Sequence, residues 1–126
     1  LHRSLEMSRV QMDKRAFEKL KRGKMKPEAT IDLHGLTLGQ AQPALVQFIL
    51  AASTSGKRLV LVITGKGKAA EDYGPIPRQK GILRHHVPRW LGMAPLAPFV
   101  LQVSAAHIKH GGGGAYYVYL KRKKTS

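Results

Sequence analysis

The run Leu59–Ile63, LVLVI in one-letter code, decides the fold class of this chain, because all five side chains are apolar and three are β-branched. A short continuous run of this kind is typical of a strand that is covered on both faces, whereas a strand with one wet face alternates apolar and polar residues. Gly56 ends the preceding segment and Gly65 follows shortly after the run. Turn-forming residues therefore bound the run on both sides, which predicts a short, fully buried strand.

A helix is predicted directly before this strand. Thr37 is followed three residues later by Gln40, which forms a capping box, and apolar residues then recur at three- and four-residue steps over 38–52. A second helical pattern occupies 82–91. Pro43 and Pro88 lie inside the two patterns, and each is expected to bend its helix. The two apolar stripes are Leu38, Ala41, Leu45, Phe48, Ile49 and Ala52, and Ile82, Leu83, His86, Val87, Trp90 and Leu91.

Three further segments have the composition of strands, namely 29–33, 99–103 and 115–120, and the last two are expected to pair across a longer connection. The order β, α, β, α, β, β predicts an α/β fold, a two-layer βαβαββ sandwich with a mixed four-stranded sheet. A chain of 126 residues is long enough for one domain of this kind. We expect a basic N-terminal arm over 1–28 that is partly helical or mobile, a folded domain over 29–121 and a basic tail over 122–126.

Positive charge dominates the composition, with 22 Lys and Arg against seven Asp and Glu and a formal net charge of +15. An ordinary solvated surface carries both acidic and basic residues. The large excess of positive charge therefore favours polyanionic partners, with nucleic acid as the first candidate. No run of about 18 apolar residues exists, so neither a membrane span nor a membrane partner is expected. The absence of Cys excludes thiolate chemistry and fits a cytoplasmic protein.

An acid and an imidazole lie two residues apart at the end of the first predicted strand, in Ile31-Asp32-Leu33-His34-Gly35. Alternate strand residues share a face, so Asp32 and His34 can point into one site. The other six carboxylates lie in the N-terminal stretch or in a predicted loop, which leaves Asp32 as the acid of a core element. Two interpretations of Asp32 stay open: an acid-base group, or a cap on the backbone amide two residues further on.

A glycine- and lysine-rich segment, Thr64-Gly65-Lys66-Gly67-Lys68, follows the buried strand. Its two glycines let backbone amides turn toward an anion and its two lysines supply charge, which predicts a phosphate-binding loop. The alternative is a simple turn with solvated lysines. The pattern Gly-x-x-x-x-Gly-Lys-Ser/Thr is absent, so no nucleotide triphosphatase activity is expected.

Several cations flank the second predicted helix. Arg84 is our first choice for a catalytic cation, because Arg can hold a phosphate with two hydrogen bonds. Arg78 and Lys80 are predicted phosphate contacts near the start of the helix, where the helix dipole adds to their field. Arg89 is interpreted as part of a solvated helix face. The tyrosines of the predicted strand 115–120 are interpreted as cross-strand packing, with base stacking as the alternative.

A run of four glycines, Gly111–Gly114, precedes the last predicted strand. It predicts a tight reversal or a close approach to the backbone of a ligand, with Gly112 as a candidate contact, while linker flexibility is the alternative. His110 is a candidate site residue beside this run, whereas His107 is interpreted as a loop residue. A zinc site made of His34 and these two histidines would lack the usual ligand spacing, so no metal and no other cofactor is expected.

Three of these motifs occur in a fixed order: DLHGLT at 32–37, VITGKG at 62–67 and GGGGA at 111–115. In this order and spacing the chain resembles the Smr domain, the small MutS-related domain, over residues 30–121. The resemblance implies a fold similar to the C-terminal domain of bacterial translation initiation factor three. It also implies activity as a nicking or RNA-cleaving endonuclease, a hydrolase that acts on phosphodiester bonds.

The resemblance also carries site residues over to this chain. The Asp and His of the family's first motif correspond to Asp32 and His34, and Gly35 of the same motif is a candidate nucleic-acid contact. The second motif of the family normally begins with His, and this chain has Thr64 at that position. Stand-alone bacterial members of the family often carry a basic N-terminal extension, and residues 1–28 resemble such an extension.

The residues and the resemblance together predict an endonuclease that prefers RNA, with branched or nicked DNA as an alternative substrate. Two-metal nucleases hold their ions with several carboxylates, and only one acid is expected in the core of this domain, so metal-independent acid-base catalysis is expected. The rival is a non-catalytic nucleic-acid or ribosome-binding module, in which the basic arm contacts the ribosome. A protein adaptor is a third interpretation. The direction of proton transfer, the base preference and the oligomeric state stay open.

Overall fold

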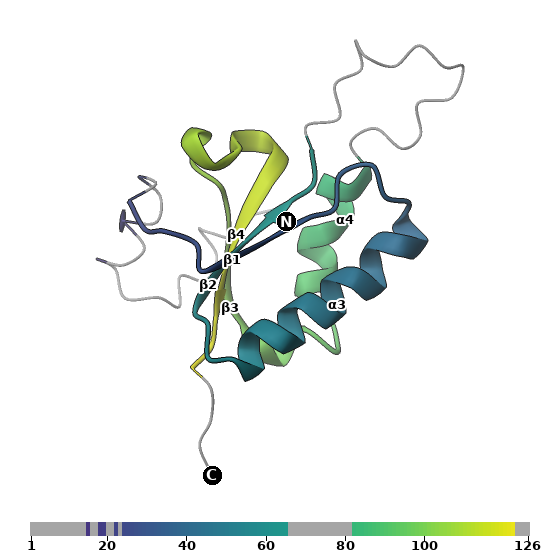
Figure 1. Cartoon of the computed structure of the whole chain (residues 1–126), viewed down its shortest axis with the longest axis horizontal. Helices are drawn as coiled ribbons and strands as arrows, with labels where there is room; N and C mark the ends of the chain where they lie inside the picture. Colours follow the sequence, from purple (N-terminus) through teal and green to yellow (C-terminus); the bar gives the residue numbers. More distant parts are fainter. Residues whose placement is uncertain (1–14, 16–17, 20–21, 23, 66–81, 123–126) are drawn as a thin grey trace.

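Four strands form one mixed sheet in the computed structural model of the chain, which describes residues 15, 18–19, 22, 24–65 and 82–122 (Figure 1). Strand β4 is antiparallel to both of its neighbours, β2 and β3, whereas β1 and β2 are parallel. The order in the sheet is β1-β2-β4-β3, so β1 and β3 are the edge strands. The strands are β1 (Ala29–Asp32), β2 (Leu59–Ile63), β3 (Val100–Ala105) and β4 (Ala115–Leu120).

Two helices, α3 (Leu38–Thr54) and α4 (Ile82–Leu91), cover one face of this sheet (Figure 1). The order β1, α3, β2, α4, β3, β4 confirms the predicted α/β fold with a mixed four-stranded sheet. Short 3-10 turns complete the chain path: η2 (Ala97–Phe99) leads into β3, while η3 (Ile108–His110) and η4 (Gly112–Gly114) connect β3 to β4. In the described ranges no helix combines the length and the apolar character needed to cross a membrane.

Strand β2 is buried on both faces, as its sequence predicts. Val60 and Val62 belong to the core between the sheet and the two helices, whereas Leu59 and Leu61 belong to a second apolar cluster on the opposite side. All four side chains are at most 7% exposed. Burial of an aliphatic side chain stabilises a fold by about 1.5–3 kcal/mol, so both clusters hold this strand in place.

Helix α3 begins with the predicted capping box. The Thr37 hydroxyl accepts a hydrogen bond from the Gln40 amide at 3.2 Å, and the Gln40 side chain accepts one from the Thr37 amide at 3.1 Å. The helix then runs unbroken through Pro43, and α4 runs unbroken through Pro88. Leu38 and Phe48 of the predicted stripe are only partly buried, while its buried members are Ala41, Leu45, Ile49 and Ala52.

Two strand boundaries differ from those predicted. Strand β1 ends one residue early, because Leu33 begins a turn in which the Leu36 amide donates to the Leu33 carbonyl at 3.0 Å. Strand β3 begins one residue later than the predicted 99–103, since Phe99 still belongs to the turn η2. It also ends later, because Ala105 keeps its pairing with β4.

The side of the sheet away from the helices is contacted by the segment that leads into β1. Met25 packs against the second apolar cluster, and the Glu28 amide donates to the Leu59 carbonyl at 2.8 Å. One carboxylate oxygen of Glu28 accepts hydrogen bonds from the amides of Arg58 and Leu59, at 2.5 and 3.0 Å. These contacts attach the end of the predicted arm to the domain, and most of the arm lies outside the described residues.

Candidate active site

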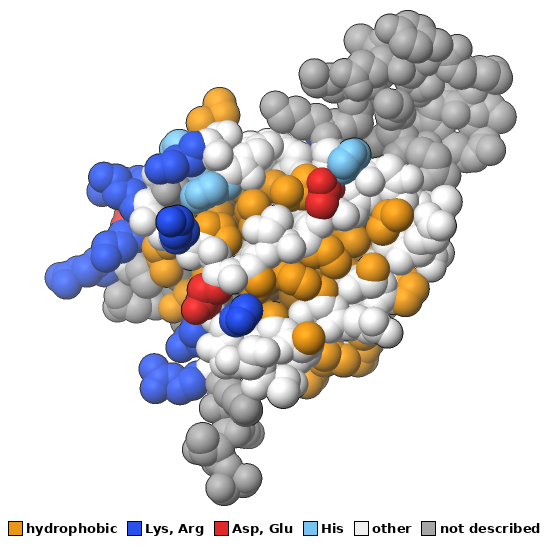
Figure 2. All heavy atoms as spheres, viewed as in Figure 1, with side chains coloured by type: hydrophobic (Ala, Val, Ile, Leu, Met, Phe, Trp, Pro, Cys, Tyr) orange, Lys and Arg blue, Asp and Glu red, His pale blue; other side chains and the backbone are white. Residues whose placement is uncertain are grey.

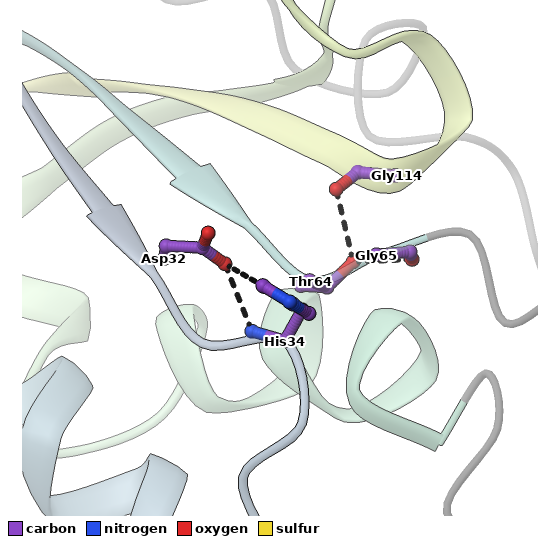
Figure 3. A network of polar contacts seen from close by, with 5 residues as sticks. All are labelled: Asp32, His34, Thr64, Gly65 and Gly114. Atoms are coloured by element: carbon purple, nitrogen blue, oxygen red, sulfur yellow. Dashed lines mark hydrogen bonds and ion pairs between the residues drawn. The ribbon is translucent and has the colours of Figure 1, made fainter.

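Asp32 and His34 meet at the end of β1, on the edge of the sheet. The Nδ1 atom of His34 lies 2.6 Å from Oδ1 of Asp32, and the His34 amide donates to the same oxygen at 3.0 Å (Figure 3). The cap interpretation of Asp32 is therefore confirmed, and the same carboxylate oxygen also holds the imidazole, while the acid-base role stays a prediction. These contacts fix the orientation of the ring.

Both side chains of this pair are open to solvent, with 49% of Asp32 and 67% of His34 exposed. Partial burial pushes the pKa of Asp32 upward, but the hydrogen bonds and the charge interaction with His34 outweigh it and hold this pKa below its usual value. The carboxylate is thus ionised at neutral pH. When the neutral imidazole donates Nδ1–H to Asp32, Nε2 has no proton and can accept one from a substrate, which is the arrangement that general-base catalysis needs.

The end of β2 and the glycine run come together beside this pair (Figure 3). The Gly114 carbonyl accepts hydrogen bonds from the Thr64 amide at 2.8 Å, the Gly65 amide at 3.0 Å and the Thr64 hydroxyl at 3.3 Å. Gly65 also lies close to the His34 side chain, since a Cβ atom at this position would be 3.2 Å from the Cβ of His34. The fold therefore gathers the three sequence motifs at one end of the sheet.

Gly35 and Gly65 both have a left-handed backbone, with φ of +85° and +87°. This conformation costs little for glycine and is unfavourable for residues with a Cβ atom, so both turns depend on glycine. Thr64 is buried at 7% exposure and its hydroxyl also donates to the Gly65 carbonyl at 3.2 Å. In these contacts the Thr64 side chain joins two segments of the site, and its predicted phosphate contact stays a prediction.

Arg84 lies on α4, and its described contacts lead to Tyr116 of β4. The Tyr116 hydroxyl donates to the Arg84 carbonyl at 2.8 Å. Burial raises the pKa of Tyr116, and the positive charge of Arg84 opposes this rise. The neighbours of Asp32, Ile31 and Leu33, both pack in the core between the sheet and the helices. Because successive strand residues point to opposite faces, the Asp32 side chain points to the face of the sheet away from the helices. None of the described contacts brings Arg84 to the Asp32–His34 pair, and its catalytic role stays a prediction.

The other predicted site residues divide into two groups. His110 and Gly112 lie in the turns η3 and η4, and Gly112 has a left-handed backbone with φ of +53°. No group of three or more His, Asp or Glu side chains in the described ranges is arranged to hold a metal ion. The remaining predicted contacts lie outside the described residues; they are Lys66, Gly67, Lys68, Arg78 and Lys80.

Tyr117 supports the glycine run, a role that the sequence did not indicate. Its side chain is fully buried, and its hydroxyl accepts a hydrogen bond from the His107 amide at 3.2 Å and lies 2.5 Å from Nδ1 of His110. The alternating pattern of the last strand places this ring on an inner face, but the partners of its hydroxyl depend on how the turn η3 folds back over the strand. Tyr117 thereby anchors the turn that leads to Gly114.

His110 is expected to resist protonation in the folded protein. Burial is the main reason, and the positive charges of Lys109 and of His107 add to it, so the pKa of His110 lies below the ordinary value of 6.5. NMR titration of the imidazole should show this lowered pKa, and Lys109→Gln should raise it by removing one positive neighbour. In the urea-unfolded chain the pKa should return to the ordinary range.

The sign of the stability effect follows from this shift. The unfolded chain binds a proton at His110 at a higher pH than the folded chain does. The contribution of this group to stability is therefore present above about pH 6.5 and is lost as the pH falls through the lower, folded pKa. A His110 pKa at or above its unfolded value would contradict this expectation.

Comparison with known proteins places the chain in a family. The Smr domain family matches residues 31–121. A relative named probable DNA endonuclease SmrA, from Escherichia coli strain K12, is 31% identical over 124 residues, which are 97% of this chain and 60% of the relative. A ribosome rescue factor SmrB from Klebsiella pneumoniae strain 342 is 32% identical over 114 residues, which are 89% of this chain and 54% of the relative. The chain thus spans little more than half the length of these relatives.

Two solved structures share the fold. YdaL, a stand-alone small MutS-related protein from Escherichia coli, superposes with a TM-score of 0.68 at 30% identity, covering 90% of this chain and 80% of YdaL. The Smr domain of Thermus thermophilus MutS2 gives a TM-score of 0.57 at 25% identity, covering 74% of this chain and 98% of that domain. The family match includes all three segments that meet around the Asp32–His34 pair, and this chain therefore belongs to the Smr domain family.

Proposed function

We propose that this chain is an endonuclease that cleaves RNA by metal-independent acid-base catalysis at Asp32 and His34. The observation that carries the proposal is the 2.6 Å contact between Oδ1 of Asp32 and Nδ1 of His34, which orients an exposed imidazole with Nε2 available. The net charge of +15 supports a polyanionic substrate. Relatives named DNA endonuclease and ribosome rescue factor support the same class of substrate.

The proposed reaction uses the ribose 2′-hydroxyl as nucleophile. Nε2 of His34 takes the proton of this hydroxyl while O2′ forms a bond to phosphorus, and the bond from phosphorus to O5′ breaks. The imidazolium that forms is stabilised by Asp32 and returns a proton to the departing O5′, directly or through water. The products are a 2′,3′-cyclic phosphate and a 5′-hydroxyl end. Lys66 and Lys68 are the cations that we propose for the charge that develops on the phosphate.

The test is incubation of the purified chain with end-labelled RNA and with DNA of the same sequence, with and without a strong chelator. We expect cleavage of RNA that persists in the chelator and leaves cyclic phosphate ends, because the nucleophile needs no metal-activated water. Analysis of the ends by treatment with a phosphatase, before and after acid opening of the ring, identifies the product. Cleavage that the chelator abolishes and magnesium restores would contradict the mechanism.

A second candidate function is a non-catalytic module that binds nucleic acid or the ribosome. The sequence favours it at one position, because Thr64 stands where the family's second motif normally has His. The buried Thr64 hydroxyl donates to two backbone carbonyls and offers no imidazole for proton transfer. RNA or ribosome binding by the chain without cleavage of any RNA or DNA substrate would support this function, with residues 1–28 as the proposed ribosome contact.

A further inference from the structure

Cations gather on the side of the sheet away from α3 and α4 (Figure 2). Met25 packs against the second apolar cluster, which places the exposed Lys24 and Lys26 over that side. Arg58 lies over the ring of Tyr119, a member of the same cluster. Tyr117 and Tyr119 of β4 both belong to the second apolar cluster. Lys121 follows two residues later, so the alternation of strand side chains places it on the same side of the sheet. We call Lys24, Lys26, Arg58 and Lys121 the basic face.

Arg58 is held in a fixed position on this face. Its guanidinium carbon lies 5.1 Å from the centroid of the Tyr119 ring, and its Nε–H donates to the Leu120 carbonyl at 2.9 Å. These two contacts restrict the side chain and leave its terminal nitrogens available. An arginine that is already ordered loses less conformational entropy when it binds a phosphate, which favours it as a contact over a free surface lysine.

Few acids oppose these cations. In the described part of the chain the acids are Glu18, Glu28 and Asp32. Glu18 pairs with Arg22 at 4.0 Å, and Glu28 accepts two backbone hydrogen bonds, which hold its pKa below the usual value despite partial burial. Asp32 is held by His34. Glu28 stays ionised and interacts with Arg58, but this one carboxylate does not neutralise the four cations of the basic face, which keeps a net positive charge that attracts a polyanion.

The candidate active site opens toward the same side. Asp32 is paired with Ile63 in the sheet, and Ile63 packs with the second cluster, not with the helix-side core. Arg58 precedes β2 and Thr64 follows it, so six residue steps separate them, a span of about 20 Å at about 3.3 Å per residue. The fixed arginine and the Asp32–His34 pair thus lie near opposite ends of one strand.

We infer that the basic face binds a nucleic-acid strand that extends from the Asp32–His34 pair along β2 to Arg58. The inference rests on the proposed function for its catalytic end, while the binding that it predicts is measured separately. A linear polyanion is the partner that fits, because Arg58 and Lys121 lie at one end of the sheet while the pair suited to phosphodiester chemistry lies at the other end of β2. The contacts are phosphate contacts, so they carry little sequence preference.

The test is the salt dependence of binding to a fluorescent single-stranded DNA of about 20 nucleotides, longer than the usual single-strand sites of about 4–16 nucleotides. DNA has no 2′-hydroxyl, so binding is separated from the proposed cleavage. The plot of log K for binding against log salt has a negative slope. The double variant Lys26→Gln/Arg58→Gln should reduce the magnitude of this slope by about 1.4, since each phosphate contact contributes about 0.7. The matched variant Lys57→Gln/Arg89→Gln removes the same charge from the helix side and should change the slope far less.

Circular dichroism and thermal unfolding of each variant establish that it is folded. If loss of the Arg58 contacts unfolds the chain, the variant Lys24→Gln/Lys26→Gln, with two exposed side chains, tests the same face and should also lower the slope by about 1.4. Equal slopes for the basic-face and helix-side variants would overturn the inference. It would also be overturned if the basic-face variants bound anionic lipid vesicles more weakly than the parent chain but bound the DNA equally well. Suppose that the basic-face variants change the slope as expected and the parent chain cleaves no RNA. The proposed catalysis would then be refuted, while binding by the basic face would be supported.

Discussion

Replacing Asp32 with asparagine is expected to lower the rate of RNA cleavage by about 10²- to 10⁴-fold, the usual contribution of a positioned acid-base system. Asparagine keeps an oxygen that can accept the His34 amide bond now formed at 3.0 Å, so the turn should survive. It removes the negative charge that orients the ring and stabilises the imidazolium. The measurement is the single-turnover cleavage rate of end-labelled RNA at saturating protein.

The matched control for this variant is Glu28→Gln. Glu28 is a carboxylate just before the other end of β1, where it accepts hydrogen bonds from the amides of Arg58 and Leu59, and glutamine keeps an acceptor oxygen. Its saturating cleavage rate should stay within about twofold of the parent rate, since acid-base catalysis depends on Asp32. Cleavage by Asp32→Asn at the parent rate would show that the activity resides elsewhere on the chain or in a contaminant.

Gly111→Ala is expected to destabilise the domain by about 1–3 kcal/mol, the usual cost of a strained backbone conformation. Gly111 has φ of +121°, and a Cβ atom there would lie only 2.9 Å from the Cβ of Ala115. The strain falls on the turn that presents the Gly114 carbonyl to Thr64 and Gly65, so cleavage should fall with stability. Urea unfolding measures the first effect, and the single-turnover assay measures the second.

Gly113→Ala is the control within the same glycine run. A Cβ atom at Gly113 would meet no heavy atom within 4 Å, and this residue does not have a positive φ. The substitution should change the free energy of unfolding by no more than about 0.5 kcal/mol, as for most exposed positions. If Gly111→Ala were tolerated as well as Gly113→Ala, the run would act as a flexible linker, the alternative that its composition left open.

The elements of this fold could be predicted because their signals are local. A capping box at Thr37, an apolar stripe at helical spacing and the continuous run Leu59–Ile63 each depend on residues that are near in sequence. The ends of strands were less predictable. The last residues of β1 and the first of β3 are set by turns whose hydrogen bonds depend on neighbouring segments, as at Leu33 and Phe99.

The candidate site was predictable in part. The contact between Asp32 and His34 follows from their spacing, since Asp32 ends β1 and His34 lies two residues further on, in the turn that follows. The support from Tyr117 was not predictable, because its hydroxyl bonds depend on a connection that folds back over β4. Nor could the sequence say that Arg84 packs by Tyr116, since this contact joins α4 to β4 through the core.

The sequence by itself determined the order of strands and helices, the strong positive charge and the acid-imidazole pair, because each is a property of composition or of neighbouring residues. Only the tertiary structure decided what lies beside that pair. Residues 50 positions apart, Thr64 and Gly114, are joined by hydrogen bonds that form when β2 and β4 pair in register. The sidedness of the cations was likewise decided by packing, since burial of the two apolar clusters fixes which side of the sheet each basic residue occupies.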